Sequence, residues 1–100
     1  MSDVEVSNNT ELSRYEAHIE GELAGFAEYH LRSSSIVFTH TEVAVEGQGV
    51  GSALVRESLD QIRAAGVYDV IPQCPFYRSW LEKHPDYADL VHSADTEESA

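Results

Sequence analysis

The chain has 100 residues, and 18 acidic residues against six lysines and arginines give it a formal charge of −12 at pH 7. Hydrophobic residues make up 42% of the chain, which is enough for the core of one ordinary domain. Such a negative chain repels phosphate backbones and anionic lipid, and its six cations are scattered along the sequence. We therefore expect no nucleic-acid or membrane partner, and cationic or amine-bearing partners are favoured instead.

The cysteine content and the two ends of the chain set further limits. The single cysteine, Cys74, rules out an internal disulfide and a cysteine-rich zinc site. The acidic start is unlike a signal peptide, and no apolar run approaches the roughly 20 residues that span a bilayer. We expect a soluble, cytoplasmic protein, a monomer or weak dimer, with residues 1–10 as a flexible lead-in, 11–92 as a single domain and 93–100 as an acidic tail.

The N-terminal half of the chain predicts antiparallel strands. Residues 12–20 alternate between polar and apolar side chains, and Glu20-Gly21-Glu22 forms a tight turn before a second strand over 23–31. The β-rich segments 36–40 and 41–45 follow. Together they are long for one strand, so we expect two short strands with a break between them.

The C-terminal half predicts helices around one more strand. Apolar residues recur at spacings of three and four over Ser52–Ala65, which predicts a helix. A short apolar strand over Val67–Ile71 and a second helix over Phe76–His84 follow. A right-handed crossover would place the strand at Val43 parallel to the strand at Val67. The fold class is therefore α/β (α+β), a mixed sheet with antiparallel N-terminal strands, a glycine-loop helix, a parallel strand pair and a short C-terminal helix.

A glycine loop precedes the first helix, where residues 46–51 read EGQGVG. Backbone N–H groups in such a loop can approach an anion closely, and the positive end of the helix dipole points at it. A tight turn with glycines at positive φ explains the same pattern. The loop lacks the lysine of a nucleotide-hydrolysing P-loop, and it is a poor match to the dinucleotide-binding fingerprint.

The loop and its surroundings resemble the GNAT superfamily of N-acetyltransferases, in its compact, truncated branch. The resemblance covers about residues 11–92, and its motifs are His40-Thr41-Glu42-Val43, the glycine loop, Pro72-Gln73-Cys74-Pro75-Phe76 and His84-Pro85-Asp86-Tyr87. Glu46 stands where the superfamily usually has Gln or Arg. The helices that usually follow the first strand are absent, as are the final two strands, and these parts usually shape the acceptor pocket.

The resemblance implies transfer of an acetyl group from acetyl-coenzyme A to a primary amine, on a small molecule or a protein. It places the pantetheine arm of acetyl-CoA beside a strand edge and the pyrophosphate over the glycine loop. The residues so implied are Val43, Ala44 and Val45 for the arm, and Gln48, Gly49, Val50, Gly51, Ser52 and Ala53 for the pyrophosphate. The thioester would then lie near Glu42 and Cys74.

Two residues are candidates for the base. Acetyl transfer requires that the amine lose a proton, that the carbonyl oxygen be stabilised, and that the leaving thiolate receive a proton or a positive field. His40 and Glu42 lie two residues apart on one face of a strand, so either can act as the base. A polar residue at a strand end explains His40 equally well, whereas a carboxylate within an apolar β run favours a function for Glu42.

Two residues after the last strand are further candidates. Pro75 suits the first position of a helix, so Cys74 would be its N-cap, where the helix dipole favours the thiolate. Cys74 could attack acetyl-CoA, donate a proton or line the thioester pocket, and the alternative is a small buried hydrophobic residue. For Tyr77 the resemblance implies a proton donor to the thiolate, and packing in the core is the alternative.

Other functional classes remain compatible with these residues. The five histidines show neither HxxxH nor HExxH spacing, so we expect no metal. A non-catalytic acyl-CoA-binding sensor would use the same loop, and a partner-binding module could keep the fold without a ligand. These classes differ from an enzyme in what Cys74 and Glu42 do.

Overall fold

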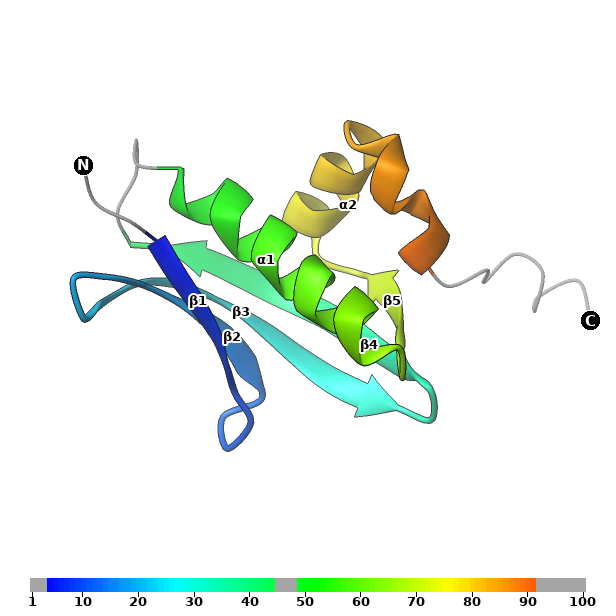
Figure 1. Ribbon diagram of the computed structural model, residues 1–100, viewed down its shortest axis with the longest axis horizontal. Coiled ribbons are helices and arrows are strands. Elements are labelled where there is room, and N and C mark those ends of the chain that lie inside the picture. Colours follow the sequence, from blue (N-terminus) through cyan, green and yellow to red (C-terminus); the bar gives the residue numbers. More distant parts are fainter. Residues whose placement is uncertain (1–3, 45–48, 92–100) are drawn as a thin grey trace, which may run out of the picture.

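The computed structural model describes residues 4–44 and 49–91, which form one mixed sheet with helices packed against it (Figure 1). In these residues the strands lie in chain order, β1-β2-β3-β4-β5, and only the last pair is parallel. The elements are β1 (Val4–Asn9), β2 (Arg14–Ile19), β3 (Glu22–Arg32), β4 (Ser35–Val43), α1 (Val50–Ala65), β5 (Asp69–Pro72), α2 (Pro75–Glu82) and the 3-10 helix η1 (Pro85–Leu90). The predicted mixed sheet with a parallel strand pair is confirmed.

The first strand lies in the segment that was expected to be a flexible lead-in. β1 pairs with β2 from Val4 opposite Ile19 to Asn9 opposite Arg14. The side chains of Val4 and Val6 pack against the core, which is the alternation that defines a half-buried strand. The expectation that residues 1–10 form a flexible lead-in is therefore wrong for residues 4–9, because the short apolar-polar alternation there is stabilised by pairing with β2.

β4 is one strand with a bulge, so the expected break into two strands was also wrong. Its register with β3 shifts by one residue, with Tyr29 opposite Phe38 but Glu28 opposite His40. Thr39 is thus the extra residue of a β-bulge, which bends a strand without ending it. The irregularity lies one residue before the segment where the break was expected.

The bulge decides which face of the sheet each later side chain occupies. Thr41 lies opposite Ala27, a completely buried core residue, so Thr41 and Val43 belong to the face that α1 covers. His40 and Glu42 alternate with them and lie on the opposite face. That opposite face, which carries Phe26 and Glu28 on β3 beside His40 and Glu42, is called the open face below.

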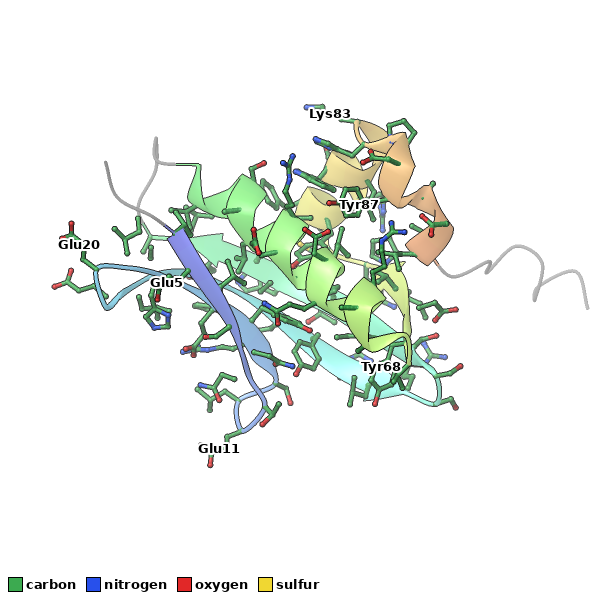
Figure 2. The ribbon with its side chains drawn as sticks, viewed as in Figure 1. Glu5, Glu11, Glu20, Tyr68, Lys83 and Tyr87 are labelled. Carbon is green, nitrogen blue, oxygen red and sulfur yellow. The ribbon has the colours of Figure 1, made fainter. Side chains whose placement is uncertain are left out.

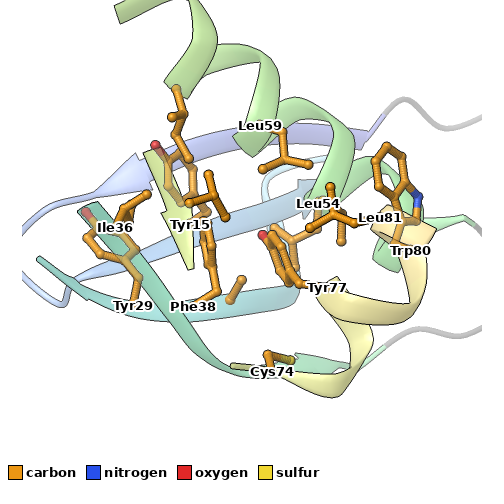
Figure 3. Close-up of a cluster of buried hydrophobic side chains, with 14 of the residues drawn as sticks. Tyr15, Tyr29, Ile36, Phe38, Leu54, Leu59, Cys74, Tyr77, Trp80 and Leu81 are labelled. Atoms are coloured by element: carbon orange, nitrogen blue, oxygen red, sulfur yellow. The ribbon is translucent and has the colours of Figure 1, made fainter. Parts of the chain in front are cut away.

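The core lies between the sheet and α1, and α2 closes one end of it (Figure 3). α1 begins after Gly49 and ends at Gly66, and both glycines have the left-handed backbone that favours glycine. Buried side chains recur along one stripe of α1, at Val50, Leu54, Val55, Ser58, Leu59 and Ile62. None of the described helices is both long and apolar enough to cross a bilayer.

The C-terminal helices are tied to α1 by polar contacts. Arg63 on α1 forms an ion pair with Asp89 at 3.0 Å, and the Tyr87 hydroxyl donates to Asp60 at 2.8 Å. Figure 2 shows Tyr87 and Lys83 on this side of the molecule, while Glu11 and Glu20 lie at the tips of the strand connections at the other side. Pro75 is at the start of α2 and Cys74 is its N-cap, as the sequence predicts.

We predict that Gly25→Ala destabilises the fold. A Cβ at position 25 would lie 2.8 Å from the carbonyl oxygen of Glu42 and 3.1 Å from Val50. Because the Glu42 oxygen is a backbone atom, β3 and β4 must move apart to remove this close contact. The expected loss is about 1–3 kcal/mol in the free energy of unfolding, measured with urea. Gly21→Asn is the control, since this turn position has open space and a left-handed backbone that Asn tolerates. Equal stabilities of the two variants would contradict the packing argument.

We also predict a loss of stability at alkaline pH. Burial raises the pKa of Tyr15 from its ordinary value of 10.0 to about 12, and burial raises the pKa of Tyr77 as well. Above pH 10 the unfolded chain releases these protons before the folded one does, so the stability present below pH 10 falls as pH rises toward 12. Urea unfolding across this range should show a shallower loss for Tyr15→Phe than for the wild type. Identical slopes would contradict the assignment.

Candidate functional site

The pairing on one edge of β4 stops halfway along the strand. β5 pairs with β4 only from Ser35 to Phe38, because the chain turns away after Pro72. The backbone N–H of Cys74 then donates to the Phe38 carbonyl at 2.8 Å, which closes this end of the pairing. Beyond Phe38, no strand within residues 4–44 and 49–91 pairs with this edge of β4.

The register shows which backbone groups face that unpaired edge. The N–H of Ala44 donates to the Ala24 carbonyl at 2.7 Å, so Ala44 and, two residues before it, Glu42 direct their backbone groups toward β3. The alternate residues Thr41 and Val43 therefore direct their N–H and C=O groups away from β3. An extended ligand with amide groups can pair with such an edge as an added strand does.

The start of α1 offers a second set of backbone donors. The first helical bond shown there runs from the N–H of Ala53 to the carbonyl of Gly49 at 3.0 Å. The N–H groups of Val50, Gly51 and Ser52 therefore make no helical bond, and the first turn carries no acidic side chain. A Cβ built at Gly49 would meet no atom within 4 Å, so the backbone there is open to approach. These features suit an anion.

The unpaired edge, the start of α1 and the start of α2 meet at Gly51. A Cβ built on Gly51 would lie 2.6 Å from Cζ of Phe76 and 3.4 Å from Cγ2 of Val43. Phe76 follows Cys74 by two residues, so the thiol belongs to the same corner of the molecule. A linear ligand could therefore reach from the donors of α1 along the edge of β4 to Cys74.

The Cys74 thiol is buried and contacts Thr41. Its Sγ lies 3.2 Å from the Thr41 Oγ1, and the residue is only 3% exposed. Sequence reasoning missed Thr41, although it stands between both candidate bases in the His40-Thr41-Glu42-Val43 motif. The bulge at Thr39 places the Thr41 hydroxyl on the face where Cys74 lies.

His40 and Glu42 form a pair on the open face. His40 Nε2 lies 2.9 Å from a carboxylate oxygen of Glu42, and their side chains are 52% and 61% exposed. The prediction that they share one face is thus confirmed, although Glu42 is not embedded in an apolar environment. Because Thr41 and Cys74 lie on the other face, the backbone of β4 stands between the thiol and the His40–Glu42 pair.

The open face has an acidic character. Glu28 lies opposite His40 on this face, and Glu16 lies opposite Phe26. The Arg14 guanidinium beside Glu16, at 2.8 Å, holds the pKa of that carboxyl below its usual range. Arg14 also covers the ring of Phe26 at 4.4 Å, so this cation is already engaged. The exposed carboxylates near His40 favour a cationic ligand.

Tyr77 lies inside the core. Its side chain is completely buried, its hydroxyl is 2.8 Å from the Ser58 hydroxyl, and its ring stacks on Phe38 with 4.1 Å between centroids (Figure 3). Burial raises the pKa of Tyr77 well above its ordinary value. This placement supports the packing alternative over a role as proton donor, because a donor must reach the reacting atoms.

The residues expected to hold acetyl-CoA differ in what they can offer. Val45 and Gln48 lie outside the described residues, as does Glu46. Ala44 and Ala53 use their N–H groups within the fold, whereas Val43, Val50, Gly51 and Ser52 have backbone groups directed to the unpaired edge or the start of α1. In residues 4–44 and 49–91, no group of three or more His, Cys, Asp or Glu side chains could hold a metal ion.

Comparison with known proteins identifies the family and the fold. The sequence matches the family model described as GCN5-related N-acetyl-transferase over residues 14–90. The chain belongs to this family. No curated protein matches the chain. Its fold resembles the NMR solution structure of a "GCN5-like putative N-acetyltransferase" from Staphylococcus aureus, with a TM-score of 0.69 and 26% sequence identity over 92% of this chain and 91% of that one. The protein is an N-acetyltransferase by family and a GNAT domain by fold.

We predict that Tyr77→Phe leaves the activity of this GNAT domain nearly intact. Loss of the buried Tyr77 hydroxyl should lower the free energy of unfolding by about 1 kcal/mol. The loss is small because the Ser58 hydroxyl keeps its hydrogen bond to the Val55 carbonyl at 2.9 Å. Turnover of acetyl-CoA with an amine should stay within about twofold of the wild type. A loss of about 100-fold or more would instead identify Tyr77 as the proton donor. Tyr29→Phe, at another buried tyrosine of the same core, is the control for stability.

Proposed function

We propose that this chain binds acetyl-CoA and transfers its acetyl group directly to a primary amine, with His40 and Glu42 as the base. Acetyl-CoA supplies the activated thioester. One observation carries the proposal: the edge of β4 that no described strand pairs with runs from the backbone donors at the start of α1 to a position with Cys74 on one face and the exposed His40–Glu42 pair on the other.

The residues present fit acetyl-CoA. The N–H groups of Val50, Gly51 and Ser52 would bind the pyrophosphate, with the positive end of the α1 dipole behind them. Thr41 and Val43 would pair with the amides of the pantetheine arm. Because the chain has a charge of −12, this local arrangement must hold the anion against the field of the whole protein.

The amine would approach from the open face. Its carboxylates attract an ammonium group, and His40 lies where the strand edge and this face meet. When His40 Nε2–H donates to Glu42, the Nδ1 atom is the basic nitrogen and can accept the proton of the amine. Glu42 holds the imidazole in this tautomer and stabilises the imidazolium that forms. The amine lone pair then attacks the carbonyl carbon, and the C–S bond breaks. The leaving thiolate of coenzyme A takes the second proton from the attacking nitrogen, so the products are the acetylated amine and coenzyme A as its thiol.

A second route is favoured by the position of Cys74. This residue is the N-cap of α2, and the Thr41 hydroxyl contacts its sulfur. In this route the Cys74 sulfur attacks the thioester carbonyl, the Cys74 proton leaves on the departing thiol, and the amine takes the acetyl group from Cys74 in a second step. The burial of the thiol makes direct transfer the better-supported route.

We predict that incubation with acetyl-CoA, without an amine, leaves the intact mass of the protein unchanged. Direct transfer forms no acetyl-enzyme, so Cys74→Ala should keep turnover within about tenfold of the wild type. A gain of one acetyl group that disappears in Cys74→Ala would contradict direct transfer and support the second route. Absence of acetyl-CoA binding by calorimetry would overturn both routes, and binding without turnover over a panel of amines would indicate a sensor.

We predict that Glu42→Gln and His40→Gln each lower kcat by about 100-fold or more. His40→Gln removes the proton acceptor itself, whereas Glu42→Gln removes the carboxylate that holds the imidazole in place. Glu28→Gln is the matched control, because Glu28 lies opposite His40 on the same face but outside the pair. An equal loss in all three variants would show a general field effect and would contradict the base assignment.

A further inference from the structure

Phe76 packs on Gly51 at the corner where the proposed site is assembled. A Cβ on Gly51 would lie 2.6 Å from Cζ and 3.2 Å from Cε2 of the Phe76 ring, both far inside contact distance. The ring therefore rests directly on the backbone of the first turn of α1. Gly51 has no left-handed backbone, so its conformation does not require glycine.

A second contact repeats this arrangement one turn further along α2. The indole N–H of Trp80 donates to the Ser52 hydroxyl at 3.2 Å. Phe76 and Trp80 are four residues apart and lie on one stripe of α2, while Gly51 and Ser52 are adjacent on α1. This stripe docks α2 on the first turn of α1.

The docking sets the distance between two parts of the site. Gly51 and Ser52 carry N–H groups proposed for the pyrophosphate, and Cys74 is the residue at which α2 begins. Phe76 is 41% exposed, so its ring does not fill the core as Tyr77 does. A large apolar side chain that remains this exposed beside Val43 is better explained by the site it adjoins than by stability.

We propose that Phe76 is a positioning residue: its ring on Gly51 holds the Cys74 end of the strand edge at a fixed distance from the phosphate-binding turn of α1. This inference rests on the proposed function. It assigns the third glycine of the loop, Gly51, to contact with Phe76, whereas the family resemblance implies that this glycine serves close approach of the pyrophosphate.

The two assignments predict different outcomes for a pair of substitutions. Gly51→Ala pushes the ring away, and we expect kcat/KM for acetyl-CoA to fall about tenfold or more, because displacement of a site by about 1 Å is enough for such losses. Adding Phe76→Leu makes room for the new methyl group, so the double variant should recover to within about threefold of the wild type. Phe76→Leu alone should lower kcat/KM only modestly, through KM.

The control is a double variant that combines Gly51→Ala with Leu23→Ala. Leu23 is an apolar residue on β3 and is 42% exposed, about as much as Phe76. This pair should behave as Gly51→Ala alone. If Phe76→Leu fails to rescue Gly51→Ala, or Gly51→Ala is as active as the wild type, the inference is overturned. A wild-type protein that neither binds nor turns over acetyl-CoA overturns the proposed function instead, so the two failures are distinct.

Discussion

The site depends on one feature of the sheet, which is that β5 is much shorter than β4. β5 ends at Pro72, and the chain then turns into α2 with Cys74 bonded to the Phe38 carbonyl. Proline has no backbone N–H to donate to a neighbouring strand, so Pro72 itself favours the end of β5 at this position. Within the part of the chain that the structure describes, no strand pairs with the remaining length of β4 on that side, and the placement proposed for the pantetheine arm follows from this edge.

The bulge at Thr39 gives that edge two chemically different sides. Without the extra residue, Thr41 would share the open face, and His40 and Glu42 would point into the core under α1. With the bulge, the buried Cys74 thiol and the Thr41 hydroxyl lie on one side of the strand. The exposed His40–Glu42 pair, which is proposed as the base, lies on the other. Amine and thioester can thus approach one strand edge from separate faces.

The negative charge acts differently on the two substrates of the proposed reaction. A polyanion such as coenzyme A must be held by local N–H groups and a helix dipole against the overall field. A cationic amine is drawn to the same surface, and most strongly where carboxylates such as Glu28 and Glu42 gather on the open face. The acidic composition therefore favours binding of a cationic acceptor, whereas it opposes binding of the acyl donor.

Much of the site could be predicted from the sequence, because it rests on local patterns. The glycine loop before an apolar-periodic helix, Pro75 after Cys74, and the two-residue spacing of His40 and Glu42 all depend on near neighbours in the chain. The strand at residues 4–9 was missed because a short polar alternation gains its stability only from pairing with β2.

The tertiary structure alone decided how those pieces meet. The sequence determined the family, the mixed sheet, the N-cap position of Cys74 and the shared face of His40 and Glu42. Only the fold placed Thr41 against Cys74, buried Tyr77 against Phe38, and set Phe76 on Gly51. Those contacts join residues far apart in the chain, and they are fixed by strand register and helix docking, which no local pattern encodes.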